Sequence, residues 1–278
     1  MPISLRYLGV LLAVLGGAPL LRAQTAAVGA TAGTVRLTPQ RSEQALTGVL
    51  QLQAAPWLSL SATPSFVHVS DIVSGRSVSS NGMGDLPLSA DASHSFATAG
   101  SPVLASALTV VFPTGNAACG LGSGETSFGL DLGAGVSPSP RLHLSADASR
   151  SISGLSAQSG LSAPHATSLR GEASYDVAPS WTTSVSLGAD VGQSDSTQAL
   201  SRTLGAGITH ALAGTLTLTV DAGVGLSATS PKWALSIGIG RVFAGTSPVS
   251  LASPSRRLKS TFVGGVSRGS GGGKIGCR

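Results

Sequence analysis

Apolar and polar residues alternate along most of this chain, and the alternation limits the folds open to it. From Thr215 to Leu226, leucine, valine and alanine occupy every second position, while threonine, aspartate and glycine fill the others. A period of two places the two sets on opposite faces of a β-strand, whereas a helical pattern would repeat about every 3.6 residues. We therefore expect an all-β chain whose strands have one apolar face and one polar face.

Segments with this alternation recur twelve times, which is an even number. Most of them are longer than the roughly 9–11 residues that a tilted strand needs to cross a bilayer. The predicted strands cover residues 32–39, 43–54, 56–69, 84–97, 101–113, 124–137, 139–152, 167–178, 180–192, 202–212, 214–227 and 231–243.

The connections between these segments also alternate, in length. Short Pro/Gly turns alternate with longer polar links, which lie at 70–83, 114–123, 153–166 and 193–201. Outer-membrane barrels have short periplasmic turns and longer outer loops. The order therefore predicts that both ends of the sheet lie on the periplasmic side.

Large aromatic residues fall near the ends of the predicted strands and not at their centres. Amphipathic rings favour the two membrane–water interfaces, whereas a soluble β-sandwich would bury its rings in strand centres. The residues predicted to lie at a membrane interface are Phe66, Phe96, Phe112, Phe128, Tyr175, Trp181, Trp233 and Phe243.

A sheet in hydrocarbon must close on itself. An unpaired backbone N–H or C=O costs several kcal/mol there, so strands cross a membrane only in a ring without edges. The sequence thus predicts a transmembrane antiparallel up-and-down β-barrel of about twelve strands. We expect its location to be the outer membrane, with lipid as one partner and small solutes as the other.

The two ends of the chain differ from this middle part. Residues 1–23 have a basic start, an apolar stretch of 15 residues and a small Ala23, as in a cleaved signal peptide. Residues 24–243 form the predicted barrel, and residues 244–278 are rich in Gly, Ser and basic residues. We expect this tail to be a flexible extension and, because Phe262 is its single aromatic residue, not a nucleic-acid surface.

Strand parity predicts an acidic lumen. Nine acids and three bases fall on the polar face, and carboxylates in a pore disfavour anions. The alternative is that these are solvated polar residues that pair with their neighbours. Besides Lys232, the predicted lumen-lining residues are Asp85, Asp91, Glu125, Asp131, Arg141, Asp147, Arg170, Glu172, Asp176, Asp190 and Asp221.

Five short motifs resemble one family of bacterial proteins. They are Gly82-Met-Gly-Asp-Leu86, Leu108-Thr-Val-Val-Phe-Pro-Thr-Gly115, Leu121-Gly-Ser-Gly-Glu-Thr-Ser-Phe-Gly-Leu130, Ser230-Pro-Lys-Trp233 and Gly238-Ile-Gly-Arg-Val-Phe243. In pattern and order they are similar to the outer-membrane β-barrel transporter family of the meta-pathway of phenol degradation. The resemblance implies a barrel in a Gram-negative-type outer membrane that passes small, often hydrophobic or aromatic compounds. It also implies insertion by the barrel-assembly machinery. The tail beyond Phe243 departs from this pattern, because a barrel's last strand normally ends the chain.

Two other functions stay open at this point. His143 and Ser145 have the His-x-Ser spacing of outer-membrane phospholipases, but the chain has only Asn81 and Asn116 to orient the imidazole. An exported β-sheet adhesin outside the membrane is the other alternative. We expect a channel and not an enzyme, with no catalytic residue, cofactor or metal site.

The two cysteines complete the predictions. Cys119 falls in a predicted outer loop and Cys277 in the tail on the other side. We therefore expect no disulfide between them within one molecule.

Overall fold

The computed structural model describes most of the predicted barrel. The described residues are 25–153, 167–191, 201–212, 215–228 and 230–243, so the predicted signal peptide and the tail after Phe243 lie outside them. Within the described residues all strands belong to one antiparallel sheet, and no helix is long and apolar enough to cross a membrane.

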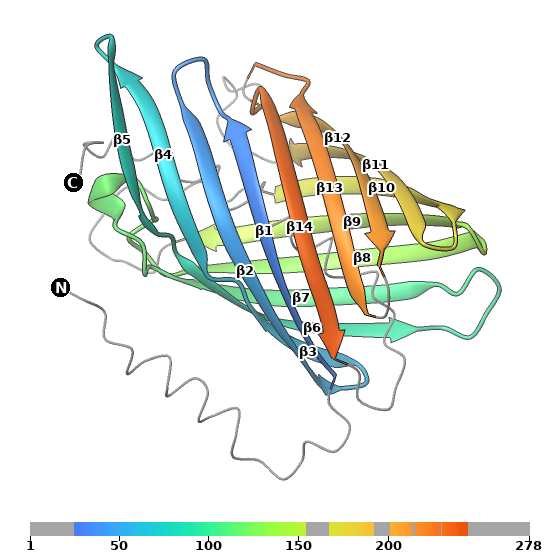
Figure 1. The fold of residues 1–278 in the computed structure, drawn as a ribbon. Coiled ribbons are helices and arrows are strands. Elements are labelled where there is room, and N and C mark those ends of the chain that lie inside the picture. The colour runs from blue at the N-terminus through green and yellow to red at the C-terminus, as the bar shows by residue number, and fades with distance from the viewer. Residues whose placement is uncertain (1–24, 154–166, 192–200, 213–214, 229, 244–278) are drawn as a thin grey trace.

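The sheet closes on itself through its first strand. β1 (Ala26–Arg36) pairs on one side with β2 (Ser42–Ala55) and on the other with β14 (Trp233–Phe243). Both pairings extend over the whole of β1, from Ala26 opposite Phe243 to Arg36 opposite Trp233. Figure 1 shows the resulting barrel. The predicted closure is therefore confirmed.

Twelve strands cross the barrel, as predicted, although two of them are interrupted. β3 (Leu58–Ala62) and β4 (Ser65–Val73) both pair with β2 and form one crossing. β5 (Arg76–Met83) pairs with β4, and β6 (Leu86–Ser95) pairs with β3, so these two form the next crossing. Pro64 causes the first break, because it lacks the N–H that would continue the ladder.

The remaining strands follow in simple up-and-down order, each paired with its neighbour in sequence. They are β7 (Val103–Phe112), β8 (Ser127–Ser139), β9 (Leu142–Ser153), β10 (Thr167–Ala178), β11 (Trp181–Val191), β12 (Arg202–Ala211) and β13 (Leu216–Gly225). A short 3-10 helix, η2 (Ala117–Cys119), lies in the connection between β7 and β8.

Two predicted boundaries at the start of the barrel are wrong. The first strand is Ala26–Arg36 and not 32–39, because small Ala and Gly residues weaken the alternation there. The polar link predicted at 70–83 is the tip of a hairpin formed by β4 and β5. Its turn, Ser74–Gly75, has positive φ at both residues, the geometry of a tight hairpin turn.

The two faces of the sheet differ as the alternation predicts. In β14, the side chains of Trp233, Leu235, Ile237 and Ile239 are 44–51% exposed on the outside of the ring. The alternate residues Ser236 and Gly238 face inward and are less accessible. The barrel therefore has an apolar outer surface and a polar inner one.

The barrel has two distinct ends. At the short-turn end, tight turns such as Pro56–Trp57 and Pro140–Arg141 join the strands, and both Ala26 and Phe243 lie there. The long-loop end contains the β4–β5 hairpin and the β7–β8 connection, and the segments 154–166 and 192–200 join strands at this end but are outside the described residues.

Candidate transport lumen

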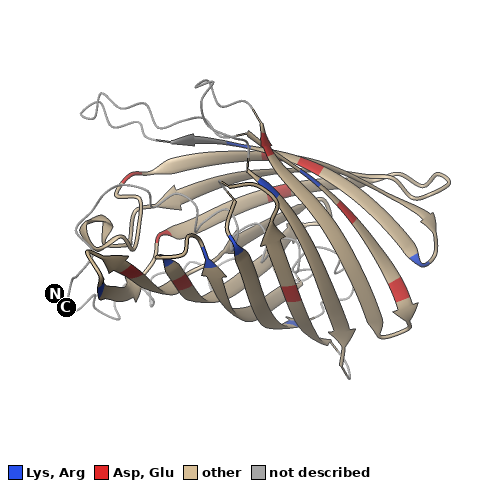
Figure 2. Ribbon diagram, turned by 90° about the horizontal axis from the view of Figure 1, so that it is seen from above, with Lys and Arg blue, Asp and Glu red and all other residues tan. Residues whose placement is uncertain are grey.

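Most of the predicted lumen residues lie on one part of the ring, from β8 to β13. Figure 2 shows acidic positions on many of the strands. Five of the acids lie on the inner face of β8 to β13, opposite the exposed apolar side chains: Asp131, Asp147, Glu172, Asp190 and Asp221. Asp91 has the same orientation in β6.

The inner face is open along one part of the ring and filled along another. Beside β1 to β4 the inward side chains are almost inaccessible: Thr31, Val35, Glu43, Thr47, Val49, Ser59, Ser61 and Val69. Inward residues of β8 to β13 are mostly half-buried. The accessible inner surface therefore follows β8 to β13, where most of the acids lie.

Three acids fall on one line across the sheet. Asp91 lies opposite Ala107, which in turn lies opposite Asp131. Across β9 and β10 the same line reaches Asp190 through two serines whose hydroxyl oxygens are 2.6 Å apart. Aligned carboxylates and hydroxyls offer hydrogen-bond acceptors to a solute, and the carboxylates attract cations.

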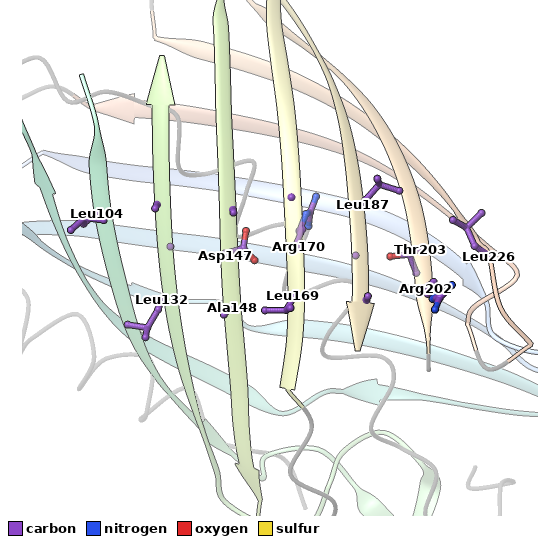
Figure 3. A pocket seen from close by; sticks show the side chains of 16 residues that line it. Leu104, Leu132, Asp147, Ala148, Leu169, Arg170, Leu187, Arg202, Thr203 and Leu226 are labelled. Carbon is purple, nitrogen blue, oxygen red and sulfur yellow. The ribbon is translucent and has the colours of Figure 1, made fainter. Parts of the chain in front are cut away.

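One arginine balances part of this acidity. Arg170 Nη2 is 3.2 Å from Glu172 Oε2 and donates to Ser186 Oγ at 3.2 Å. Asp147 lies directly opposite Arg170 on the neighbouring strand, and their side chains are next to each other in Figure 3. This part of the lumen therefore has basic and acidic groups side by side.

The β7–β8 connection folds over the inner side of the β4–β5 hairpin. Cys119 and Leu121 pack with Val69 in a small buried cluster against which Val67 also packs. Asp85 holds the connection in place: its carboxylate accepts hydrogen bonds from Gly115 N at 3.0 Å and from Ser123 N and Oγ, both at 2.7 Å. Of the predicted lumen residues, Asp85 therefore anchors the β7–β8 connection. Glu125 lies within that connection.

Replacing Asp85 should free this connection. A carboxylate with three donors stabilises a loop by more than a neutral acceptor does, since each charged hydrogen bond contributes about 1.5–3 kcal/mol. We expect Asp85→Ala to raise the rate of protease cleavage between 113 and 126 and to increase single-channel conductance. Asp85→Asn, which keeps one acceptor oxygen and loses the charge, is the matched control and should lie in between. Unchanged cleavage and conductance in Asp85→Ala would contradict this role.

At the short-turn end, a histidine joins two polar neighbours. His143 Nδ1 is 2.8 Å from Ser137 Oγ, and Nε2 is 3.3 Å from Asp176 Oδ2, which belongs to a carboxylate that also accepts from Thr182 Oγ1 at 2.6 Å. Arg141 is exposed in the adjacent turn.

This geometry does not fit the His143/Ser145 hydrolase. The hydroxyl that contacts His143 belongs to Ser137 and not to Ser145. In a catalytic triad the serine contacts Nε2 and the acid contacts Nδ1, which is the reverse of the contacts found here. The cluster is a polar network of the inner wall.

The aromatic residues lie on the outer surface. Seven of the eight predicted interface rings are 40–48% exposed, and Phe128 is half-buried. Near the short-turn end, Trp181 stacks on His210 with ring centroids 4.0 Å apart, Phe96 meets His94 edge-on, and Arg241 lies 5.1 Å from the Phe243 ring. The prediction that Phe66 lies near the outer end of its strand is wrong, because β4 continues to Val73.

Some inner residues escaped the sequence prediction. Arg41 Nη2 is 2.8 Å from Glu43 Oε1, and this ion pair faces inward from the start of β2. Glu43 is the first residue of the predicted strand 43–54. The strand before it was predicted at the wrong residues, so the sequence did not show that this end of the sheet has an inner face. Ser137 ends the predicted strand 124–137, but the sequence gives no sign that its hydroxyl contacts His143.

The prediction for the cysteines is also wrong. Cys119 is disulfide-bonded and almost fully buried. The chain's other cysteine, Cys277, lies outside the described residues.

No group of three or more His, Cys, Asp or Glu residues within the described ranges is placed to hold a metal ion. The candidate site is the accessible inner surface of β8 to β13.

The fold is that of an outer-membrane β-barrel channel. In structure the chain is similar to the COG4313 outer membrane channel from Pseudomonas putida F1, with a TM-score of 0.64, 17% identity and coverage of 80% of this chain and 95% of that one. It is also similar to the KdgM porin, with a TM-score of 0.54, 10% identity and coverage of 78% and 99%. A third is the NanC porin, with a TM-score of 0.52, 9% identity and coverage of 77% and 98%.

Sequence comparison identifies the family. The model of the family described as "Putative MetA-pathway of phenol degradation" matches residues 17–241, and the chain belongs to this family. The predicted family resemblance is thus confirmed. No curated protein matches the chain.

Proposed function

We propose that the chain is a passive channel of the outer membrane that passes small solutes through an acidic lumen. The observation that carries this proposal is the closed ring with an apolar outer face and with inward acids and hydroxyls on β8 to β13. Such a ring satisfies every strand N–H and C=O inside a bilayer and leaves polar side chains for an inner path.

The path follows the accessible inner surface of β8 to β13. Beside β1 to β4 the inward side chains are buried, and the β7–β8 connection covers part of the β4–β5 hairpin. Twelve strands enclose less space than the sixteen to eighteen of the wide porins. The channel is therefore narrow and suits small solutes, among which family membership favours hydrophobic or aromatic compounds.

We assign the residues around this path by their positions. Asp91, Asp131, Asp147, Arg170, Glu172, Asp190 and Asp221 line it, while Asp176 and Arg141 lie at the short-turn mouth and Asp85 and Glu125 at the long-loop mouth. The exposed rings of Phe96, Tyr175, Trp181 and Phe243 form the interface belt at one end, and the exposed rings of Phe112 and Trp233 with the half-buried ring of Phe128 form it at the other.

The proposed orientation places the short-turn end in the periplasm. Residues 1–23 direct export. β14, the last described strand, contacts the barrel-assembly machinery, and the tail 244–278 follows it in the sequence. The exposed outer arginine and stacked rings at the short-turn end suit a headgroup region.

Reconstitution tests the function. Purified protein in planar bilayers should give discrete conductance steps, and liposomes containing it should release small aromatic solutes faster than disaccharides. Bilayers without conductance, together with no solute release from liposomes, would rule out a channel. Release of protein from membranes without detergent would instead favour the adhesin.

A further inference from the structure

The outer surface of the barrel carries a groove that the transport path does not use. It has a volume of about 760 Å³ and crosses β7 to β12 on the side that faces hydrocarbon. Figure 3 shows its leucine borders in order across the strands, from Leu104 and Leu132 past Leu169 to Leu226, with Arg202 near one end. Ligand pockets in proteins have volumes of about 300–1,000 Å³, so this groove is large enough to hold a ligand.

Small residues form the floor of the groove. Outward positions there are Ala134, Ala146, Ala148, Gly171 and Ala189, between leucines that are 47–58% exposed. A Cβ at Gly171 would have no neighbour within 4 Å, so the space above it is open. The side chains of Asp147 and Arg170 turn away from the groove into the lumen, and only their strands border it.

The groove rises toward the long-loop end. One line of paired residues runs from Leu132 through Ala148, Leu169 and Ala189 to Arg202. Leu132 lies well inside β8, which begins at Ser127, whereas Arg202 is the first residue of β12. A chain lying in the groove would thus have one end deep in the membrane and the other at the rim, beside a guanidinium.

Charge on this surface is of one sign. Arg202 and Arg150, both exposed and outward, lie near the long-loop rim, and no described carboxylate forms an ion pair with either. All acids of β8 to β13 lie on the inner face. Outward cations at a membrane rim attract anionic lipid headgroups.

The spacing of the two arginines selects among such lipids. Arg150 is in β9 and Arg202 in β12, three strand spacings apart and offset by two residues along the strands, which separates their backbones by about 16 Å. One phosphate could be reached by both only with both side chains fully extended, whereas a headgroup with two phosphates reaches both readily.

We propose that this groove binds a bisphosphorylated glycolipid of the lipid A class, with an acyl chain over Gly171 and phosphates at Arg202 and Arg150. The lipid belongs to the outer leaflet, so the site agrees with the proposed orientation but is independent of channel activity.

Native mass spectrometry of the folded barrel with hexa-acylated lipid A tests this site. We expect Arg150→Gln/Arg202→Gln to weaken binding at least tenfold and Arg241→Gln, an outward arginine at the opposite end, to leave it unchanged. Gly171→Leu should fill the groove and weaken binding severalfold. Ala206→Leu, which adds the same side chain outside the groove, should not. A heat-shift gel verifies that each variant is folded.

Lipid comparisons on the unaltered chain complete the test, so the result does not depend on any variant. Lipid A without its phosphates should bind at least tenfold more weakly than the bisphosphorylated form. Equal binding of the two forms, or full binding by the double arginine variant, would overturn the proposal. Phosphatidylglycerol that binds as tightly as lipid A would show that the occupant is an ordinary phospholipid, and this would overturn the lipid class.

Discussion

Ile237→Arg should prevent the chain from assembling in the membrane, whereas Ser236→Arg should leave assembly intact. Ile237 lies midway along β14 and its side chain is 51% exposed on the outer face. An arginine at the bilayer midplane on the lipid face of a barrel costs about 2–4 kcal/mol. That is a large share of a typical folding free energy of about 5–15 kcal/mol. The amount of heat-modifiable protein in the outer-membrane fraction measures the effect.

The neighbouring position is a matched control because it receives the same side chain in the same strand. Ser236 points inward and lies opposite Asp221, with which a new guanidinium can pair. Equal loss of assembly in both variants would show only that β14 tolerates no bulk. Loss in Ser236→Arg alone would reverse the assignment of the two faces.

The second large effect concerns ion selectivity. In Asp131→Asn/Asp147→Asn we expect the permeability ratio of potassium to chloride to fall about two- to fourfold. A unit charge about 7 Å away across water contributes about 0.6 kcal/mol, a factor near three, and salt at 0.1 M screens part of it. Both carboxylates lie on the accessible inner surface. Reversal potentials in a potassium chloride gradient give the ratio directly.

Two further variants test the electrostatic explanation. Arg170→Gln removes the base beside Asp147 and Glu172, so it should raise the same ratio. Arg241→Gln removes an outer charge and should not change it. A double aspartate variant with unchanged selectivity would mean that these carboxylates are neutralised locally and do not act on ions in the path.

Strict alternation made the central strands predictable. From β8 to β14 large apolar residues fall mainly at every second position, and only one of the two registers places leucines in hydrocarbon. Acids on the polar face, such as Asp131 and Asp221, followed from the same parity. The first crossings were harder, because β1 is built from Ala, Gly and Thr, whose hydropathy hardly differs.

Contacts between distant segments could not be read from the sequence. Parity shows that Asp85 is polar and inward but not that it meets Gly115 and Ser123. The same holds for the Ser137–His143–Asp176 network, since a serine beside a turn gives no periodic signal. The outer groove arises from Ala and Gly on four different strands and becomes visible only when their register is known.

Spin-label accessibility along β13 tests the central claim most directly. Single labels at residues 217–224 in a background with both cysteines replaced would be exposed to oxygen, which dissolves in lipid, and to a water-soluble nickel complex. We predict oxygen maxima at Leu218, Val220, Ala222 and Val224 and nickel maxima at Thr217, Thr219, Asp221 and Gly223, in antiphase with a period of two. Profiles in phase, without that period, or with the two reagents exchanged would contradict a barrel with lipid outside and water within.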